Sequence, residues 1–170
     1  MKRISFLLLV LSLTISGYAQ KKKDINKNKK TVIANINANY EKLTELSDKI
    51  WSYEEIAFQE TNSAKALAEY ARANGFKVTT GVGEIPTALV AEYGSGKPII
   101  GILGEFDALP GLSQKTVPTK DPVHEGAPGH GCGHNLFGVA SLGAAVAIKE
   151  LIASGKLKGT IRFYGTPAEE

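Results

Sequence analysis

The sequence predicts a layered α/β protein in which helices cover both faces of a sheet. Short apolar segments that favour β-strands alternate with segments in which apolar residues recur every three to four positions. This alternation is the pattern of such folds. One long, almost wholly apolar segment precedes the last predicted strand, as expected for a helix buried against a sheet. The chain has 170 residues, is 43% hydrophobic and is 22% charged. It is therefore long enough to bury the core of about one domain.

The N-terminus has the features of a secretory signal. Two basic residues precede the apolar run Ile4–Ile15, and small residues follow it up to Ala19. We expect a signal peptide over residues 1–19, cleavage before Gln20, and a periplasmic or extracellular protein. The alternative is a membrane anchor. It is disfavoured because the run is shorter than the roughly 20 residues that a membrane span needs, so no stable membrane insertion is expected.

Residues 20–30 are lysine-rich and are expected to form a flexible, solvated leader. Eight of the 20 Lys and Arg residues precede Thr31, but only one of the 17 Asp and Glu residues does, which leaves the chain from Thr31 onward at −4. The basic character belongs to the N-terminal segment, so no basic face is expected to bind nucleic acid.

The first predicted elements after the leader are two helices. Apolar residues recur every three to four positions over Ile33–Trp51, which predicts an amphipathic helix. Thr61 or Asn62 can cap a second helix, which Gly75 ends.

Strands follow the second helix. Phe76–Thr80 is a short one, and Thr87–Tyr93 and Pro98–Leu103 are two more, joined by a glycine-rich turn at residues 94–96. Asp107–Glu125 is rich in turn residues and is predicted to be a loop.

A long helix is predicted over Asn135–Ser154, followed by a strand over Thr160–Tyr164. The helix has few polar positions, so it should be buried on most sides. Ligands of such folds bind at the carboxyl ends of strands. We therefore expect Gly104–Leu112, Gly129–His134 and Gly165–Glu170 to lie along one edge of the sheet.

The run Gly129–Asn135 contains Cys132 and His134, which are candidate metal ligands. A thiolate and an imidazole both bind zinc-like ions. Glycines surround them, and three histidines lie within ten residues of the cysteine. The following helix N-terminus is expected to favour the thiolate. The alternative is a buried structural cysteine beside a helix-capping histidine.

Two adjacent glutamates, Glu169 and Glu170, follow the last predicted strand. Neighbouring side chains of a strand point to opposite faces, so both can serve one site only from a turn, which residues 165–167 can provide. One carboxylate could then bind a metal while the other accepts a proton from water. The alternative is a solvated acidic pair.

A second acidic pair, Glu105 and Asp107, leaves a predicted strand on one face. The pair could bind a metal directly, or it could hold a metal-binding residue in its orientation. Alternatively, Asp107 could simply begin a turn. His124 is expected at the surface. Three further glutamates are expected to serve helix ends and turns: Glu54, Glu55 and Glu60.

Four segments together resemble the metal-dependent aminoacylase and carboxypeptidase family, in its branch of bacterial and plant amidohydrolases. The resemblance covers roughly Leu46 to Glu170, and its order and spacing are specific. The matching segments are Trp51–Glu60, Gly104–Gln114, Gly131–Asn135 and Phe163–Glu170.

The resemblance implies a three-layer α/β/α zinc-peptidase-like catalytic domain with two divalent ions, zinc or manganese. By position, Cys132, His134 and Glu170 match the family's metal ligands and Glu169 its general base. Asp107 matches an aspartate of the first motif and is expected among the catalytic residues. Glu105 stands where many members have a ligand histidine, and Asn135 stands where many have aspartate.

The implied reaction is hydrolysis of the amide bond of a small N-acyl or aroyl amino acid, such as p-aminobenzoyl-glutamate. A related dipeptidase or aminopeptidase, or a non-catalytic subunit of the same fold, are the alternatives. Family members continue past the position of Glu170 with further ligand histidines and a dimerisation domain. Residues 31–170 are thus expected to be the N-terminal part of a longer, homo- or hetero-oligomeric enzyme, and inactive alone.

The export signal gives the first testable prediction. N-terminal sequencing of protein recovered from the cell envelope should begin at Gln20, or at the pyroglutamate formed from it. Envelope protein that still carries Met1 would contradict the predicted cleavage.

Overall fold

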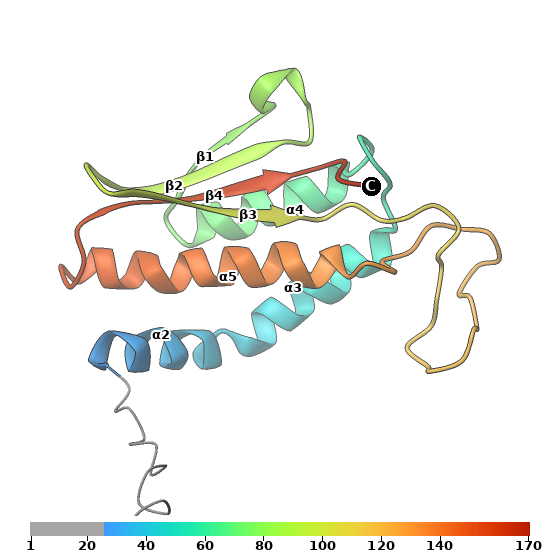
Figure 1. Ribbon diagram of the computed structural model, residues 1–170, viewed down its shortest axis with the longest axis horizontal. Helices are drawn as coiled ribbons and strands as arrows, with labels where there is room; N and C mark the ends of the chain where they lie inside the picture. Colours follow the sequence, from blue (N-terminus) through green and yellow to red (C-terminus); the bar gives the residue numbers. More distant parts are fainter. Residues whose placement is uncertain (1–25) are drawn as a thin grey trace, which may run out of the picture.

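The computed structural model describes residues 26–170 (Figure 1). The expected signal peptide and most of the expected leader lie outside the described residues. Helix α2 (Lys27–Ala38) already begins at Lys27. The expectation that the flexible leader extends to residue 30 is therefore wrong. The side chain of Asn26 starts this helix by accepting a hydrogen bond from the Asn28 N–H at 2.7 Å.

The single helix predicted over Ile33–Trp51 is two helices, α2 and α3 (Tyr40–Tyr53), separated at Asn39. The Asn39 amide side chain donates to the Asn35 carbonyl at 2.9 Å. Asparagine side chains compete for backbone groups in this way, which explains a break that the apolar periodicity does not reveal.

Helix α4 (Thr61–Ala73) confirms the second predicted helix, but the predicted cap is wrong. Neither Thr61 nor Asn62 caps it. The carboxylate of Glu55 accepts hydrogen bonds from the backbone N–H groups of Asn62 and Ser63, both at 2.8 Å. Glu55 thus serves a helix end, as expected, and anchors the chain between α3 and α4.

The sheet has four strands in the order β1-β2-β4-β3: β1 (Lys77–Thr80), β2 (Leu89–Ser95), β4 (Gly159–Thr166) and β3 (Ile99–Glu105). The strands predicted from the sequence are all present. β2 and β3 are consecutive, but β4 lies between them, antiparallel to β2 and parallel to β3. The carboxyl ends of β3 and β4 therefore lie at the same edge.

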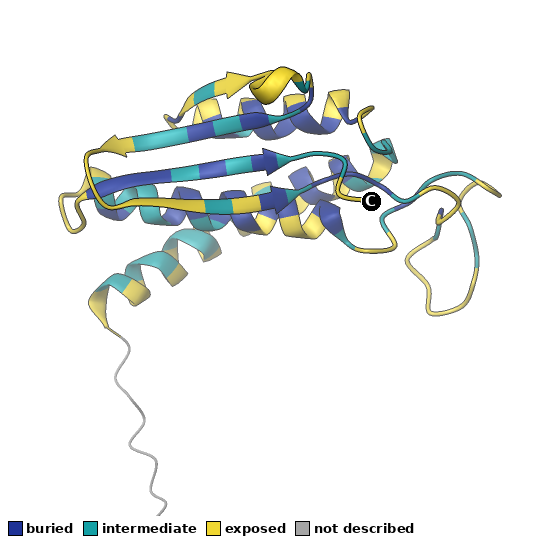
Figure 2. Ribbon diagram, turned by 45° about the horizontal axis from the view of Figure 1, so that its top comes forward, coloured by how far each residue is buried: buried dark blue, intermediate teal, exposed yellow. Residues whose placement is uncertain are grey.

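Helix α5 (His134–Ala153) connects β3 to β4 and packs on the sheet. By length and composition it could cross a membrane, yet here it is the core helix. Figures 1 and 2 show the α-helices of residues 26–170 on one face of the sheet. The α/β class is confirmed, but the second helical layer is not among these residues. The largest fully buried core side chains include Ile50, Leu67, Phe106, Leu142 and Phe163.

Gly138 sets how closely α5 approaches β3. A Cβ atom at this position would lie 2.5 Å from the Glu105 carbonyl oxygen, which is backbone and cannot swing aside. The close approach places the first turn of α5 directly behind the end of β3. His134, which begins the helix, is thereby held beside Glu105.

Gly138→Ala should therefore destabilise the protein by about 1–3 kcal/mol, the usual cost of overpacking. The matched control is Gly143→Ala in the same helix. Its Cβ would meet only side-chain methyl groups, those of Leu43 at 3.1 and 3.2 Å and the Ile36 Cδ1 at 3.8 Å, and these can shift. The cost should therefore stay below about 1 kcal/mol, since alanine also favours the helix. Urea denaturation of both variants measures the difference. Equal stabilities would show that the contact is unimportant.

Candidate metal centre

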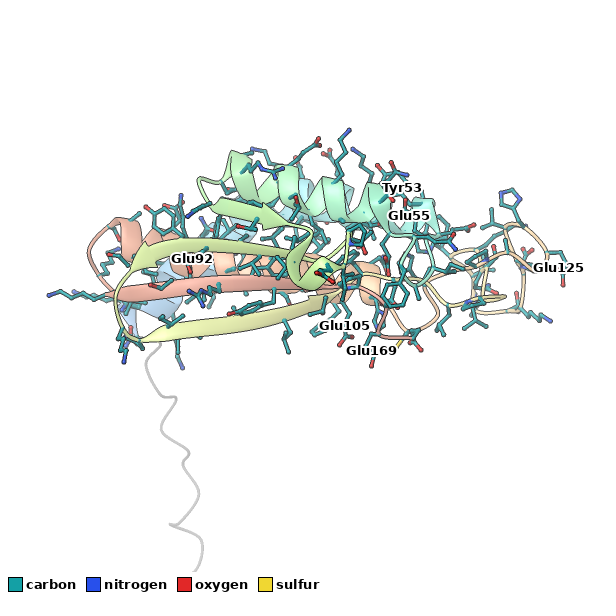
Figure 3. All side chains as sticks on the ribbon, turned by 90° about the horizontal axis from the view of Figure 1, so that it is seen from above. Tyr53, Glu55, Glu92, Glu105, Glu125 and Glu169 are labelled. Atoms are coloured by element: carbon teal, nitrogen blue, oxygen red, sulfur yellow. The ribbon has the colours of Figure 1, made fainter. Side chains whose placement is uncertain are left out.

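The candidate site lies at the carboxyl edge shared by β3 and β4. Glu105, the last residue of β3, pairs in register with Thr166, the last residue of β4. Figure 3 shows Glu105 and Glu169 close to each other at this edge, while Glu55 and Glu125 lie elsewhere. The three segments that the sequence predicted to share an edge do so.

His134 is the centre of the cluster. It is 4% exposed, and its Nδ1 lies 2.9 Å from Oδ1 of Asp107. A carboxylate only accepts hydrogen bonds, so the proton on this side belongs to Nδ1. The other ring nitrogen, Nε2, faces three carboxylates, at 3.1 Å from Glu105, 3.8 Å from Glu169 and 3.9 Å from Glu170.

Asp107 positions two groups at once. Its side chain is fully buried, with one oxygen on His134 and the other accepting a hydrogen bond from the Glu170 backbone N–H at 3.0 Å. The sequence left open a metal ligand, a carboxylate that orients a ligand, and the start of a turn; the geometry favours the orienting role. Such carboxylate–histidine pairs fix the ring orientation of metal-binding histidines.

The two glutamates reach the site because the chain turns sharply after β4. Ala168 has φ 58°, in the left-handed region that residues with a Cβ rarely adopt. The turn falls at Ala168, one residue beyond the predicted 165–167. It brings carboxylate oxygens of both Glu169 and Glu170 to within 4 Å of the His134 ring.

Cys132 is exposed and lies just before the first turn of α5. Its pKa is raised, first by a hydrogen bond with Glu170, then by desolvation and by the charges of Glu170, Glu169 and Glu105. The helix N-terminus is expected to favour the thiolate, whereas the nearby carboxylates act in the opposite direction. A cation among them would reverse this balance.

Two overlapping groups could hold a divalent ion: Cys132 with His134 and Glu170, and Glu105 with His134 and Glu169. Within each group the candidate ligand atoms all lie within 4.8 Å of one another. Sulfur, nitrogen and oxygen donors of this kind suit zinc-like ions. Because one buried nitrogen faces several acidic groups, the residues fit a cation chemically. The structure thus brings the three predicted ligands together and adds Glu105.

The other two histidines do not join the cluster. His130 Nε2 donates to the Ile50 carbonyl at 3.2 Å, and burial lowers its pKa, which favours the neutral ring. His130 thereby ties the cysteine loop to α3. His124 is exposed in the loop after β3, as predicted.

One residue near the site escaped sequence reasoning. Glu60 is the residue at the start of α4, as the expectation of a helix-end role has it, and its carboxylate also accepts a hydrogen bond from the Ala168 N–H at 2.9 Å. The two residues are 108 positions apart. No periodicity or motif could have indicated this contact.

The sequence model of the peptidase family M20/M25/M40 matches residues 101–170, the part that carries all of the candidate ligands. Over these residues the chain is similar to that family. It is 47% identical over 138 residues to a p-aminobenzoyl-glutamate hydrolase subunit of Escherichia coli, covering 79% of this chain and 28% of that protein. It is 32% identical over 151 residues to the human Xaa-Arg dipeptidase, covering 76% of this chain and 30% of that protein.

A solved structure shares the fold. A dinuclear metal binding peptidase from the M20 family of Bacillus subtilis superposes with a TM-score of 0.66 at 28% identity, covering 78% of this chain and 36% of that one. This chain thus spans about a third or less of the length of these relatives.

Asp107→Asn should weaken divalent-cation binding by about tenfold to 100-fold, the usual effect of losing a carboxylate that orients a metal-binding histidine. The amide would present an N–H group where His134 or the Glu170 backbone needs an acceptor. Isothermal titration of the full-length protein with Zn²⁺ or Mn²⁺ measures the effect. Asp121→Asn is the control, because the Asp121 side chain pairs with Lys115 at the surface, away from the cluster. Equal affinities would contradict the positioning role.

Proposed function

We propose that the full-length protein is a metal-dependent amidohydrolase that cleaves the amide bond of N-acyl or aroyl amino acids. The observation that carries the proposal is the convergence of Cys132, His134 and Glu170 on one point, with Glu169 beside them. The match of the surrounding residues to the M20/M25/M40 family supports it.

His134, Cys132 and Glu170 would hold a divalent ion, zinc or manganese, and Glu105 stands where it could contact a second. A bound divalent ion supplies Lewis-acid polarisation of the amide carbonyl and lowers the pKa of water. Cys132 must lose its proton to bind, so binding should strengthen as pH rises toward its raised pKa.

Glu169 is proposed as the general base. Its side chain is about half exposed, so it can reach both solvent water and a bound substrate, whereas that of Glu170 is 23% exposed. Its carboxylate would take a proton from the attacking water and deliver it to the leaving amine. Asp107 would keep His134 and Glu170 in place throughout.

The substrate proposal rests on the relatives. The Escherichia coli protein is named a p-aminobenzoyl-glutamate hydrolase subunit, which supports an aroyl-glutamate amide for this protein and an oligomeric assembly with other subunits. The human relative is named a dipeptidase, which keeps dipeptides as the second substrate class to test.

Glu169→Gln in the full-length protein should lower kcat for p-aminobenzoyl-glutamate by about 10²–10⁴-fold, the usual contribution of a general base. Metal content should stay near that of the wild type. Glu125→Gln is the matched control, because Glu125 is exposed in the loop away from the site (Figure 3) and its substitution should leave kcat unchanged.

The same assay separates the alternatives. Faster turnover of dipeptides than of aroyl-glutamate amides would identify a dipeptidase. No turnover of either class by metal-loaded wild-type protein would identify a non-catalytic subunit and overturn the proposal.

A further inference from the structure

We propose that Glu60 is a positioning residue that holds Glu169 and Glu170 in the site through the backbone of Ala168. The proposal rests on the proposed function above, because it assigns Glu60 a role in that same centre. Glu60 itself does not touch the reacting atoms.

Glu60 is buried completely, at 0% exposure, although it carries a carboxylate. Burial of a charged or polar group without a purpose is costly, and such groups are normally engaged. Its Oε1 accepts two backbone hydrogen bonds, from Phe58 at 3.0 Å and from Ala168 at 2.9 Å. Within residues 26–170 its Oε2 has no hydrogen-bond partner.

Both donors are strained. Phe58 has φ 61° and Ala168 has φ 58°, and each has a side chain that disfavours this region. Such conformations persist where the surroundings fix them. One buried oxygen thus stabilises two left-handed residues, one before α4 and one just before the glutamate pair.

The anchor of this interaction is rigid. Glu60 precedes α4, and its carbonyl accepts the first hydrogen bond of the helix from Ala64 at 2.9 Å. α4 packs on the sheet through fully buried residues such as Leu67. The carboxylate is therefore fixed to the core, and through it Ala168 is fixed as well.

Two buried carboxylates consequently hold the final turn of the described chain. Glu60 binds the N–H of Ala168 and Asp107 binds the N–H of Glu170, and Glu169 lies between these two points. Because both ends of this turn are hydrogen-bonded to buried carboxylates, the side chains of Glu169 and Glu170 extend from a fixed backbone. Loss of the Glu60 contact would release one end and let the turn relax toward the extended backbone of β4.

The test compares Glu60→Gln with Glu60→Ala in the full-length protein. Glutamine keeps an oxygen that can accept both hydrogen bonds, and alanine does not. Glu60→Ala should lower kcat by about tenfold to 100-fold with little change in KM, as expected when reacting groups are displaced by about 1 Å. Glu60→Gln should recover kcat to within about threefold of the wild type.

A second substitution tests the backbone itself. Glycine adopts φ > 0 readily, so Ala168→Gly should let the turn form without the carboxylate. The double variant Glu60→Ala/Ala168→Gly should regain kcat by about fivefold or more over Glu60→Ala. Glu55→Ala is the control for lost stability, since Glu55 also supports the start of α4 but does not contact Ala168. It should lower the melting temperature and leave kcat unchanged.

Hydrogen exchange supplies a readout that does not depend on activity. Peptides covering residues 163–170 should exchange faster in Glu60→Ala than in the wild type, and at the wild-type rate in Glu60→Gln. If metal-loaded wild-type protein hydrolyses no amide, the proposed function fails. Hydrogen exchange still tests whether Glu60 holds the backbone at Ala168. Unchanged exchange in Glu60→Ala, equal loss of kcat in the Gln and Ala variants, or no rescue by Ala168→Gly would each overturn the role of Glu60.

Discussion

The carboxylate of Asp107 is fully buried, with one oxygen on the His134 ring and the other on the Glu170 backbone N–H. The remaining geometry of the site depends on this residue, because it joins the three segments that meet there. It lies two residues after β3, and its side chain holds the first residue of α5 and the chain after β4. A buried carboxylate with well-placed donors on both oxygens is strongly favoured over one left unpaired, so losing either contact would be costly.

Backbone proximity makes that interaction available. Parallel pairing of β3 with β4 brings Glu105 level with Thr166, and Gly138 lets α5 approach the end of β3. The helix then presents His134 at the edge of the sheet. Neither feature is chemical in itself. Both features determine where the nitrogen, sulfur and oxygen donor atoms lie. The cluster is acidic because the segments that carry the glutamates meet at one edge of the sheet.

Many of the local parts of this arrangement can be predicted from the sequence. The strands, the core helix and the candidate ligands Cys132 and His134 follow from short patterns, whereas the family resemblance implies Glu170 as a ligand. The structure brings these three residues together. Sequence reasoning missed what depends on pairing distant residues. The sequences of β2 and β3 do not indicate that β4 lies between them. The raised pKa of Cys132 reflects carboxylates that arrive from two other segments. The bond between Glu60 and Ala168 spans 108 positions.

The central place of β4 has a kinetic consequence. β1 and β2 are close in sequence and can pair early, but β2 and β3 flank a gap that only β4 fills. Pairs such as Ala91 with Phe163 join residues that are far apart in the sequence, and such contacts form slowly because a long loop must close first. Until β4 enters, β2 and β3 each present one more unpaired edge than in the complete sheet, in which β1 and β3 are the outer strands among the described residues. The interval before its insertion is therefore the stage of folding at which the chain is most exposed to association with other copies of itself.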